Sequence, residues 1–108
     1  GVCYHSKYLN FCERARSEIF FANNQLPIYN GYHFIIKKLE ADYKKPALFG
    51  DSLGIRTVLK RSTRVSVELL QEVFNEKGEL LFSMPIQLVC IKDSKMVKMP
   101  EKFRSIFE

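Results

Sequence analysis

The sequence has few of the residues on which several classes of protein depend. Its 108 residues include no tryptophan, three cysteines and two histidines. None of Cys3, Cys12 and Cys90 belongs to a CxxC pair, so neither a zinc site nor any other metal site nor a disulfide framework is expected. We expect reduced thiols in a cytoplasmic protein, with Cys12 as an ordinary core residue.

Long apolar runs and dense charge clusters are missing as well. No apolar stretch approaches the roughly 20 residues of a transmembrane segment, and no signal-peptide pattern is present. Lys and Arg outnumber Asp and Glu by 17 to 12, a formal net charge of +5. These cations are scattered and no nucleic-acid-binding motif accompanies them, so we expect no nucleic-acid partner. Solvated surface and a modest site for an anionic ligand both remain open.

The composition that is present suffices for a folded core. Apolar residues make up 46% of the chain and aromatic residues 13%, which excludes a disordered chain. The length fits one domain over residues 1–108.

The first segment predicts one long helix. After a turn led by Gly1, the residues from Lys7 to Ala22 show a helical period. Asn23 and Asn24 can end this helix, and Pro27 prevents its continuation. The apolar stripe consists of Tyr8, Phe11, Cys12, Ala15, Ile19 and Ala22.

Most of the remaining chain alternates with a period of two residues, which predicts strands. A strand of about twelve residues is expected from Tyr32 to Tyr43, with Ala41 and Tyr43 turned toward the core. A second strand is expected over residues 53–60, and the polar residues from Lys60 to Arg64 are expected to form a loop.

Two further strands are expected over residues 65–74 and 79–92, joined by a hairpin at Asn75–Gly78. Pro85 indicates a bulge or an unpaired stretch. A short helix from Pro100 to Phe107 is expected to dock through its aromatic residues. The order of elements predicts an α+β fold, a curved antiparallel sheet wrapped around one long central helix.

The N-terminal sequence, of the form GVxYHxxYLxxxERAR, resembles the hotdog-fold acyl-CoA thioesterases, most closely the YbgC type of the 4-hydroxybenzoyl-CoA thioesterase family. A second block, from Phe34 to Asp51, matches the same pattern, and the resemblance covers nearly the whole chain. It implies a hotdog fold and hydrolysis of an acyl-CoA to free acid and CoA, with no cofactor beyond the CoA thioester substrate. The family pattern begins with a strand and a catalytic Asp three residues before Gly1, which this sequence does not contain. Lys7 also replaces the Asn of many members.

The resemblance implies catalytic roles for Tyr4 and His5. The His5 backbone N–H would help to form an oxyanion hole at the helix N-terminus, and its side chain would orient water or donate a proton. The alternative is a helix-capping imidazole without chemistry, and His33 is expected to be structural. For the phosphates of CoA the candidates are Lys60, Arg61 and Arg64, with solvated surface as the alternative.

Members of this family are usually oligomers with sites between subunits. We therefore expect a homodimer or homotetramer joined through the strand Tyr32–Tyr43. The expected substrate is a thioester of CoA or of acyl carrier protein. A competing hypothesis is a non-catalytic module that binds acyl carrier protein or a lipid enzyme through the same fold.

Overall fold

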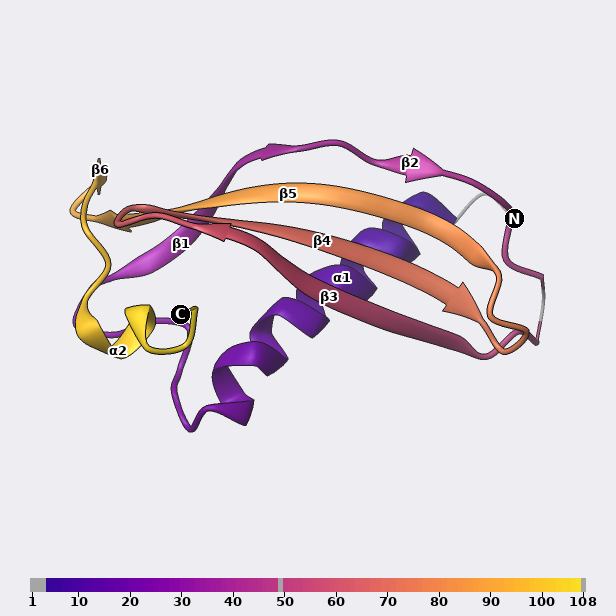
Figure 1. Ribbon diagram of the computed structural model, residues 1–108, viewed down its shortest axis with the longest axis horizontal. Coiled ribbons are helices and arrows are strands. Elements are labelled where there is room, and N and C mark those ends of the chain that lie inside the picture. The colour runs from indigo at the N-terminus through magenta and orange to yellow at the C-terminus, as the bar shows by residue number, and fades with distance from the viewer. Residues whose placement is uncertain (1–3, 49, 108) are drawn as a thin grey trace.

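The computed structural model describes residues 4–48 and 50–107, with the side chains of residues 7–48 and 50–107 (Figure 1). All strands pair antiparallel in one six-stranded sheet of order β1-β5-β4-β3, and β2 and β6 also pair with β5. The predicted order of long helix, antiparallel sheet and short helix is confirmed. The elements are α1 (Tyr4–Ala22), β1 (His33–Leu39), β2 (Asp42–Tyr43), β3 (Leu53–Ser62), β4 (Ser66–Asn75), β5 (Leu80–Lys92), β6 (Lys95–Met96) and α2 (Glu101–Arg104).

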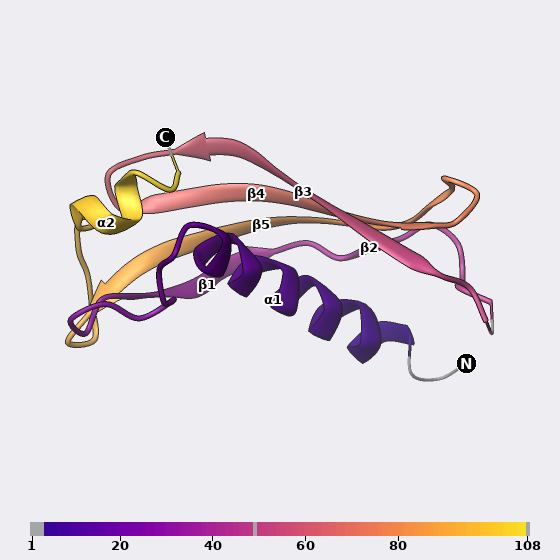
Figure 2. The ribbon, with the colours of Figure 1, turned by 90° about the horizontal axis from the view of Figure 1, so that it is seen from below.

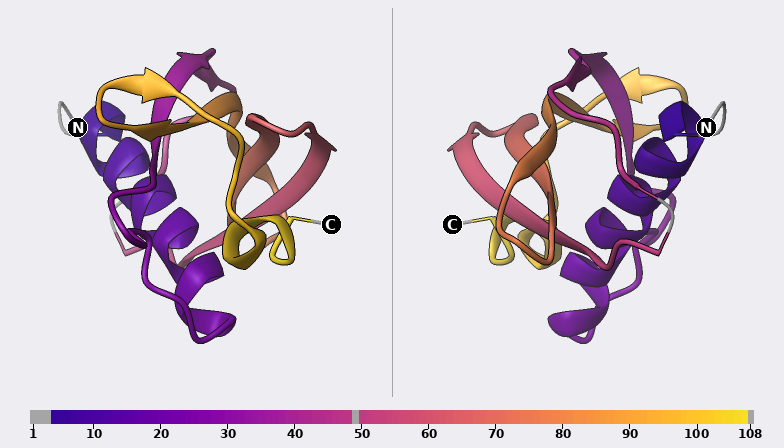
Figure 3. Two further views of the ribbon diagram at one scale, coloured as in Figure 1. Left: turned by 90° about the vertical axis from the view of Figure 1, so that its left-hand side faces the viewer. Right: turned by 90° about the vertical axis from the view of Figure 1, so that its right-hand side faces the viewer.

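Helix α1 lies obliquely across one face of the twisted sheet (Figures 2 and 3). The short α2 lies at the end of the sheet where β3 leads into β4, far from the first turn of α1 (Figure 1). Alternate residues on one face of each central strand are buried: Val67, Leu69, Gln71 and Val73 in β4, and Phe82, Met84, Ile86, Leu88 and Cys90 in β5.

The C-terminus of α1 closes as predicted. Asn24 adopts a left-handed conformation with φ of 55°. The backbone N–H groups of Asn23 and Gln25 both donate to the Phe20 carbonyl at 3.0 Å. The Asn23 side chain donates to the Ile19 carbonyl at 2.7 Å. These bonds satisfy carbonyls that the helix ladder leaves open.

One end of the predicted helix stripe is wrong. Ala22 is exposed, and Phe20, which was not predicted, is buried instead. The ring of Phe20 lies 5.5 Å from that of Phe103, 5.8 Å from that of Phe107 and 5.9 Å from that of Phe34, between ring centroids. Because residues 101–107 supply two of these three aromatic partners, the buried side of the last helical turn faces them.

The predicted long strand Tyr32–Tyr43 is divided into β1 and β2. A bulge between Ile36 and Lys38 shifts the alternation by one residue. Phe34 packs against the core before this bulge, and Ala41 and Tyr43 face it afterwards, as predicted.

Pro85 lies opposite the break between β1 and β2. Leu39 pairs with Ile86 and Asp42 pairs with Ser83, leaving an interruption between them. The Glu40 N–H donates to the Pro85 carbonyl at 3.0 Å, but Pro85 has no N–H for a return bond. The predicted unpaired stretch therefore lies on this side, while pairing with β4 continues through Pro85.

The predicted loop Lys60–Arg64 is wrong for its first three residues. Strand β3 extends to Ser62, with Arg61 paired with Glu68 and Ser62 paired with Val67. The turn is confined to residues 63–65, where the Thr63 hydroxyl oxygen accepts bonds from two backbone N–H groups. Hydrogen-bonding partners on β4 thus keep these residues in a strand, although their polar sequence favours a loop.

Candidate functional site

The first candidate region is the N-terminus of α1. Tyr4 and His5 are the first residues of this helix, while Gly1–Cys3 and the side chains of Tyr4 and His5 lie outside the described residues. The first four N–H groups of a helix have no partner within it, and the His5 N–H is one of them. The first turn contains no acidic residue and ends with Lys7. The positive end of the helix dipole is therefore not offset by a local carboxylate.

An aromatic cluster anchors this half of α1 to the sheet. The ring of Tyr8, which is 1% exposed, lies 5.2 Å from that of Phe82 and 6.1 Å from that of Tyr43. A cavity of about 250 Å³ beside it is lined by Tyr8, Tyr43, Lys44, Lys45 and Pro46. Desolvation raises the pKa of the Tyr43 phenol, which stays protonated at neutral pH.

The two lysines at this cavity already have anionic partners. Lys44 pairs with Asp42, and the Lys45 ammonium lies 2.8 Å from a Glu79 carboxylate oxygen. Hydrogen bonds from Lys45 and from Asn75 lower the pKa of Glu79, so this carboxylate is ionised at neutral pH. These exposed pairs contribute little stability, but they leave little free positive charge for a phosphate at this end.

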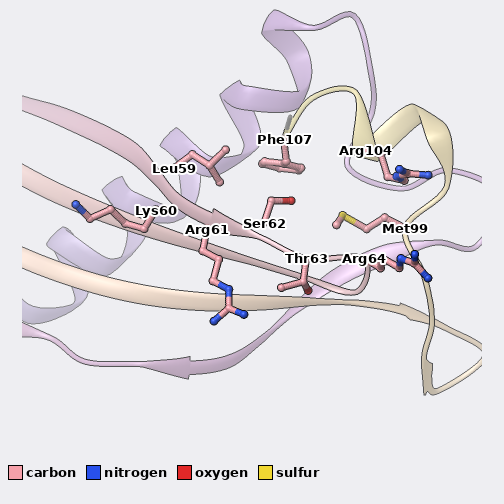
Figure 4. Close-up of a pocket in the computed structure, with 9 residues that line it drawn as sticks. All are labelled: Leu59, Lys60, Arg61, Ser62, Thr63, Arg64, Met99, Arg104 and Phe107. Atoms are coloured by element: carbon pink, nitrogen blue, oxygen red, sulfur yellow. The ribbon is translucent and has the colours of Figure 1, made fainter.

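The second candidate region is a cavity of about 580 Å³ at the end of β3 (Figure 4). It brings together the three predicted phosphate-binding residues, Lys60, Arg61 and Arg64, and adds Arg104, which was not predicted. Within the described residues, no carboxylate lies within 4.0 Å of the first three side chains, and Arg104 makes only a long, exposed pair with Glu101 at 3.9 Å. The remaining lining residues are Leu59, Ser62, Thr63, Met99 and Phe107.

The basic pocket, as we name this cavity, joins the β3–β4 turn to the C-terminal segment. The Met99 N–H donates to the Arg64 carbonyl at 2.8 Å, and Phe107 is buried. In Figure 4, Arg64 and Arg104 reach to the same side of the pocket, beyond Met99, whereas Lys60 and Arg61 extend away from it. Guanidinium groups arranged in this way suit phosphate oxygens.

The chain does not bring the two candidate regions together. The first turn of α1 and the basic pocket lie toward opposite ends of the molecule, whose longest extent is 42 Å (Figure 1). His33 belongs to neither region, and its Nδ1 lies 3.2 Å from the Gly31 carbonyl oxygen across the preceding turn. A site that uses both regions therefore needs more than one chain or a long ligand.

The edge formed by β1 exposes apolar side chains. Ile28 is 64% exposed, and Ile35 and Ile36 are each 45% exposed. They line a groove of about 440 Å³ between α1 and β1 together with Phe20 and Phe34. Exposed apolar residues gathered on one sheet edge indicate a surface that another chain covers.

Two broader features of the described residues concern metals and membranes. They contain no group of three or more His, Cys, Asp or Glu side chains placed to hold a metal ion. None of the helices in the described ranges is both long enough and apolar enough to cross a bilayer.

Comparisons with known proteins identify the relatives of this chain. Residues 1–82 match the family model described as the thioesterase superfamily. The chain is 47% identical over 74 residues to the acyl-CoA thioesterase YbgC of Helicobacter pylori, a match covering 68% of this chain and 56% of that protein. It is 30% identical over 99 residues to the acyl-CoA thioester hydrolase YbgC of Escherichia coli, covering 89% and 74%. The chain thus spans little more than half the length of the first relative.

Solved structures share the fold. A hypothetical protein from Aquifex aeolicus superposes with a TM-score of 0.87 at 21% identity, covering 97% of this chain and 85% of that one. Slr0204, a 1,4-dihydroxy-2-naphthoyl-CoA thioesterase from Synechocystis, gives 0.86 at 19% identity, covering 96% and 81%. At these identities the likeness concerns the fold alone, and it agrees with the predicted hotdog type.

Proposed function

The chain belongs to the thioesterase superfamily, and from this premise we propose that the protein hydrolyses the thioester of an acyl-CoA to the free acid and CoA. The observation that carries the proposal is the match of residues 1–82, which includes the whole of α1. The relatives from Helicobacter pylori and Escherichia coli are both named as enzymes of this activity. The free thiols of Cys12 and Cys90 agree with a cytoplasmic setting.

The reaction needs charge stabilisation at the thioester carbonyl. Water attacks the carbonyl carbon, the C–S bond breaks, and the leaving thiolate takes up a proton. In our proposal the His5 N–H donates to the carbonyl oxygen as it becomes negative, an interaction worth about 3 kcal/mol of barrier. The side chains of His5 and Tyr4 orient the water or supply the proton. The family pattern places an Asp, acting as base or nucleophile, three residues before Gly1. Assays therefore use the chain as encoded, with any residues that precede Gly1.

The basic pocket is proposed to hold the phosphates of CoA. Its four cations, Lys60, Arg61, Arg64 and Arg104, come from β3, the following turn and α2. Arg64 and Arg104 reach to the same side of the pocket and would make the first contacts to phosphate. By contrast, Lys44 and Lys45 at the other end are engaged by carboxylates. Charge-assisted contacts to phosphate are about twice as strong as neutral hydrogen bonds. The basic pocket is therefore the favoured site, since within the described residues its only ion pair is the long, exposed contact between Arg104 and Glu101.

We further propose that two chains pair through the segment Tyr32–Tyr43. The exposed side chains of Ile35 and Ile36 supply apolar contact, and the edge of β1 supplies backbone hydrogen bonds. A two-fold axis near the middle of this segment makes the paired strands antiparallel. This axis places the first turn of α1 from one chain and the basic pocket of the other chain at the same end of the dimer. The continuous sheet around both helices would then complete the hotdog architecture, and two such dimers could form a tetramer.

Release of free thiol tests the proposal. The full chain is incubated with acyl-CoA esters of increasing length and with acyl carrier protein thioesters, and CoA thiol is followed with a thiol-reactive dye. We expect turnover that saturates with acyl-CoA. Binding of acyl carrier protein without thiol release would instead support the non-catalytic module and overturn the hydrolase proposal.

A further inference from the structure

We propose that Gln71 is a positioning residue that fixes the rotation and the axial position of α1 on the sheet, and so aims the helix N-terminus. The catalytic consequence of this inference rests on the function proposed above. The geometric part, that one side chain of β4 holds α1 in place, does not depend on it.

Gln71 joins three elements of the fold through one amide group. Its Nε2 donates to the Cys12 carbonyl of α1 at 2.9 Å and to the Thr57 hydroxyl of β3 at 3.2 Å. Its Oε1 accepts from the Arg16 guanidinium at 2.8 Å. The side chain is 0% exposed. Both amide donors and the amide oxygen are therefore occupied, and the orientation of the amide is set by its partners, since a carbonyl can only accept and a guanidinium can only donate.

A polar side chain at this position demands an explanation, because its neighbours on the same face of β4, Leu69 and Val73, are apolar and buried. Burying an amide without partners costs several kcal/mol, so the bonds described above are needed for the fold. An apolar residue would fill the same space without any such requirement. The amide makes the contact directional, because a hydrogen bond weakens steeply once its donor angle is strongly bent. An apolar contact, by comparison, is non-directional and tolerates sliding and rotation of the helix.

The contact reaches the helix backbone itself. The Cys12 carbonyl lies in the middle of α1 and has a second lone pair beyond that used in the helix ladder. From Cys12 to His5 the helix runs about 10 Å. An α-helix of this length behaves as a rod, so a rotation or shift at Cys12 moves the N–H groups of the first turn with it.

Arg16 provides the second point of attachment, one turn further along α1. Burial lowers the pKa of its guanidinium, and within the described residues no carboxylate lies within 4.0 Å of it. The Gln71 oxygen therefore satisfies a guanidinium donor that is partly removed from water. Two attachments on successive turns define rotation about the helix axis better than either does alone.

The test compares three single variants of the full chain. Gln71→Met keeps the volume and removes all three bonds. Thr57→Val is a matched control inside the cluster, because it removes only the β3 partner and leaves the bond to Cys12. Val73→Ala is a control for general loss of stability on the same strand face, since Val73 is fully buried and makes no polar contact to α1.

Two readouts are taken from each variant. In hydrogen exchange we expect the amides of residues 8–16 to exchange about tenfold faster in Gln71→Met than in the Val73→Ala control. In thiol release we expect kcat to fall about tenfold or more with KM changed less than about twofold, because the displaced donors act mainly in the transition state. Thr57→Val should stay close to the wild type in both.

The outcomes separate this inference from the proposed function. If Gln71→Met exchanges like Val73→Ala throughout α1, the inference is overturned whatever the activity. Wild-type protein that releases no thiol defeats the hydrolase proposal, and hydrogen exchange alone then decides the role of Gln71. If Gln71→Met does not fold, Gln71→Glu serves in its place, because it keeps an acceptor for Arg16 and loses both donors. Normal kcat in a variant with loosened α1 would overturn the catalytic part.

Discussion

Two inactive variants of this chain should restore activity when mixed. The first variant, His5→Pro, removes the backbone N–H proposed to stabilise the oxyanion, and Pro is tolerated in the first turn of a helix. The second, Arg64→Ala combined with Arg104→Ala, removes two guanidinium groups from the basic pocket. Each variant keeps intact the region that the other one lacks.

The expected loss in each variant follows from the contacts removed. Loss of one oxyanion donor lowers kcat by about a hundredfold or more. Loss of two charge-assisted phosphate contacts, discounted for solvent exposure, lowers kcat/KM by at least about tenfold. Neither change touches the β1 edge, so both variants should still pair.

The recovery depends on where the two halves of a site come from. They lie toward opposite ends of a molecule 42 Å long. In the proposed dimer, a two-fold axis brings one half from each chain together. In an equal mixture about half of the dimers contain one chain of each variant, and one of their two sites has both halves intact. About one quarter of wild-type activity should therefore return after subunit exchange.

The assay measures thiol release at low acyl-CoA concentration before and after the two variants are mixed, partly unfolded together and refolded. A chain that carries both defects, mixed with wild-type protein, is the matched control. Its mixed dimers contain no intact site, so activity should fall from about one half to about one quarter of the wild-type value after subunit exchange. Activity that stays at the mean of the two separate variants would refute a site shared between chains.

Three further predictions concern single residues. His5→Ala should lower the rate of thiol release at least about tenfold and His5→Pro more; unchanged turnover in His5→Ala would remove the side chain, though not the N–H, from the mechanism. Phe103→Ala should destabilise the protein by about 3–5 kcal/mol in urea unfolding, since its ring is 0% exposed, and a loss below about 1 kcal/mol would contradict the packing described. Burial raises the pKa of Cys12 from 9.0 to about 11. Because the folded value is the higher one, stability should fall as pH rises between these values. Cys12→Ala should make that fall shallower, while Cys90 and Tyr43, whose pKa values burial also raises, keep contributing to it.

Much of the fold follows from local pattern. The alternation along β4 and β5 identifies their buried faces, because a strand places successive side chains on opposite sides. Asn24 ends α1 as expected, since Asn tolerates the left-handed conformation that the end of a helix requires. Pro85 marks the interruption between β1 and β2 because it has no N–H to donate to that side of β5.

The wrong predictions concern residues whose burial or secondary structure is determined by contacts with distant parts of the chain. Phe20 is buried by aromatic residues of the C-terminal segment, which helical periodicity does not report. Arg61 and Ser62 lie in a strand because β4 offers them ladder partners, although their neighbours are polar. The bulge at Ile36–Lys38 is set by pairing with β5, and no local signal marks it. In each case tertiary contact overrides local propensity.

The candidate site divides in the same way. The resemblance predicted His5 by motif, and Lys60, Arg61 and Arg64 were predicted because they lie together in one connection. Arg104 lies in the same pocket because the buried Phe103 beside it holds α2 in place. The signal available for Arg104 was its position between Phe103 and Phe107, both of which were expected to dock. Alternation along β4 places Gln71 on the same face as Leu69 and Val73, but no local pattern indicates that its amide binds α1.

The aromatic packing of the C-terminal segment has a consequence for the order of events during protein synthesis. Phe20 and Phe34 leave the ribosome long before Phe103 and Phe107, the rings that cover them. Until then the nascent chain carries an uncovered aromatic surface, a binding site for chaperones and a hazard for association with other chains. Arg104 arrives with the same segment, so the full set of cations assembles only as that surface closes. If the basic pocket binds phosphate as proposed, nascent chains should acquire that affinity late, in one step with the burial of Phe20.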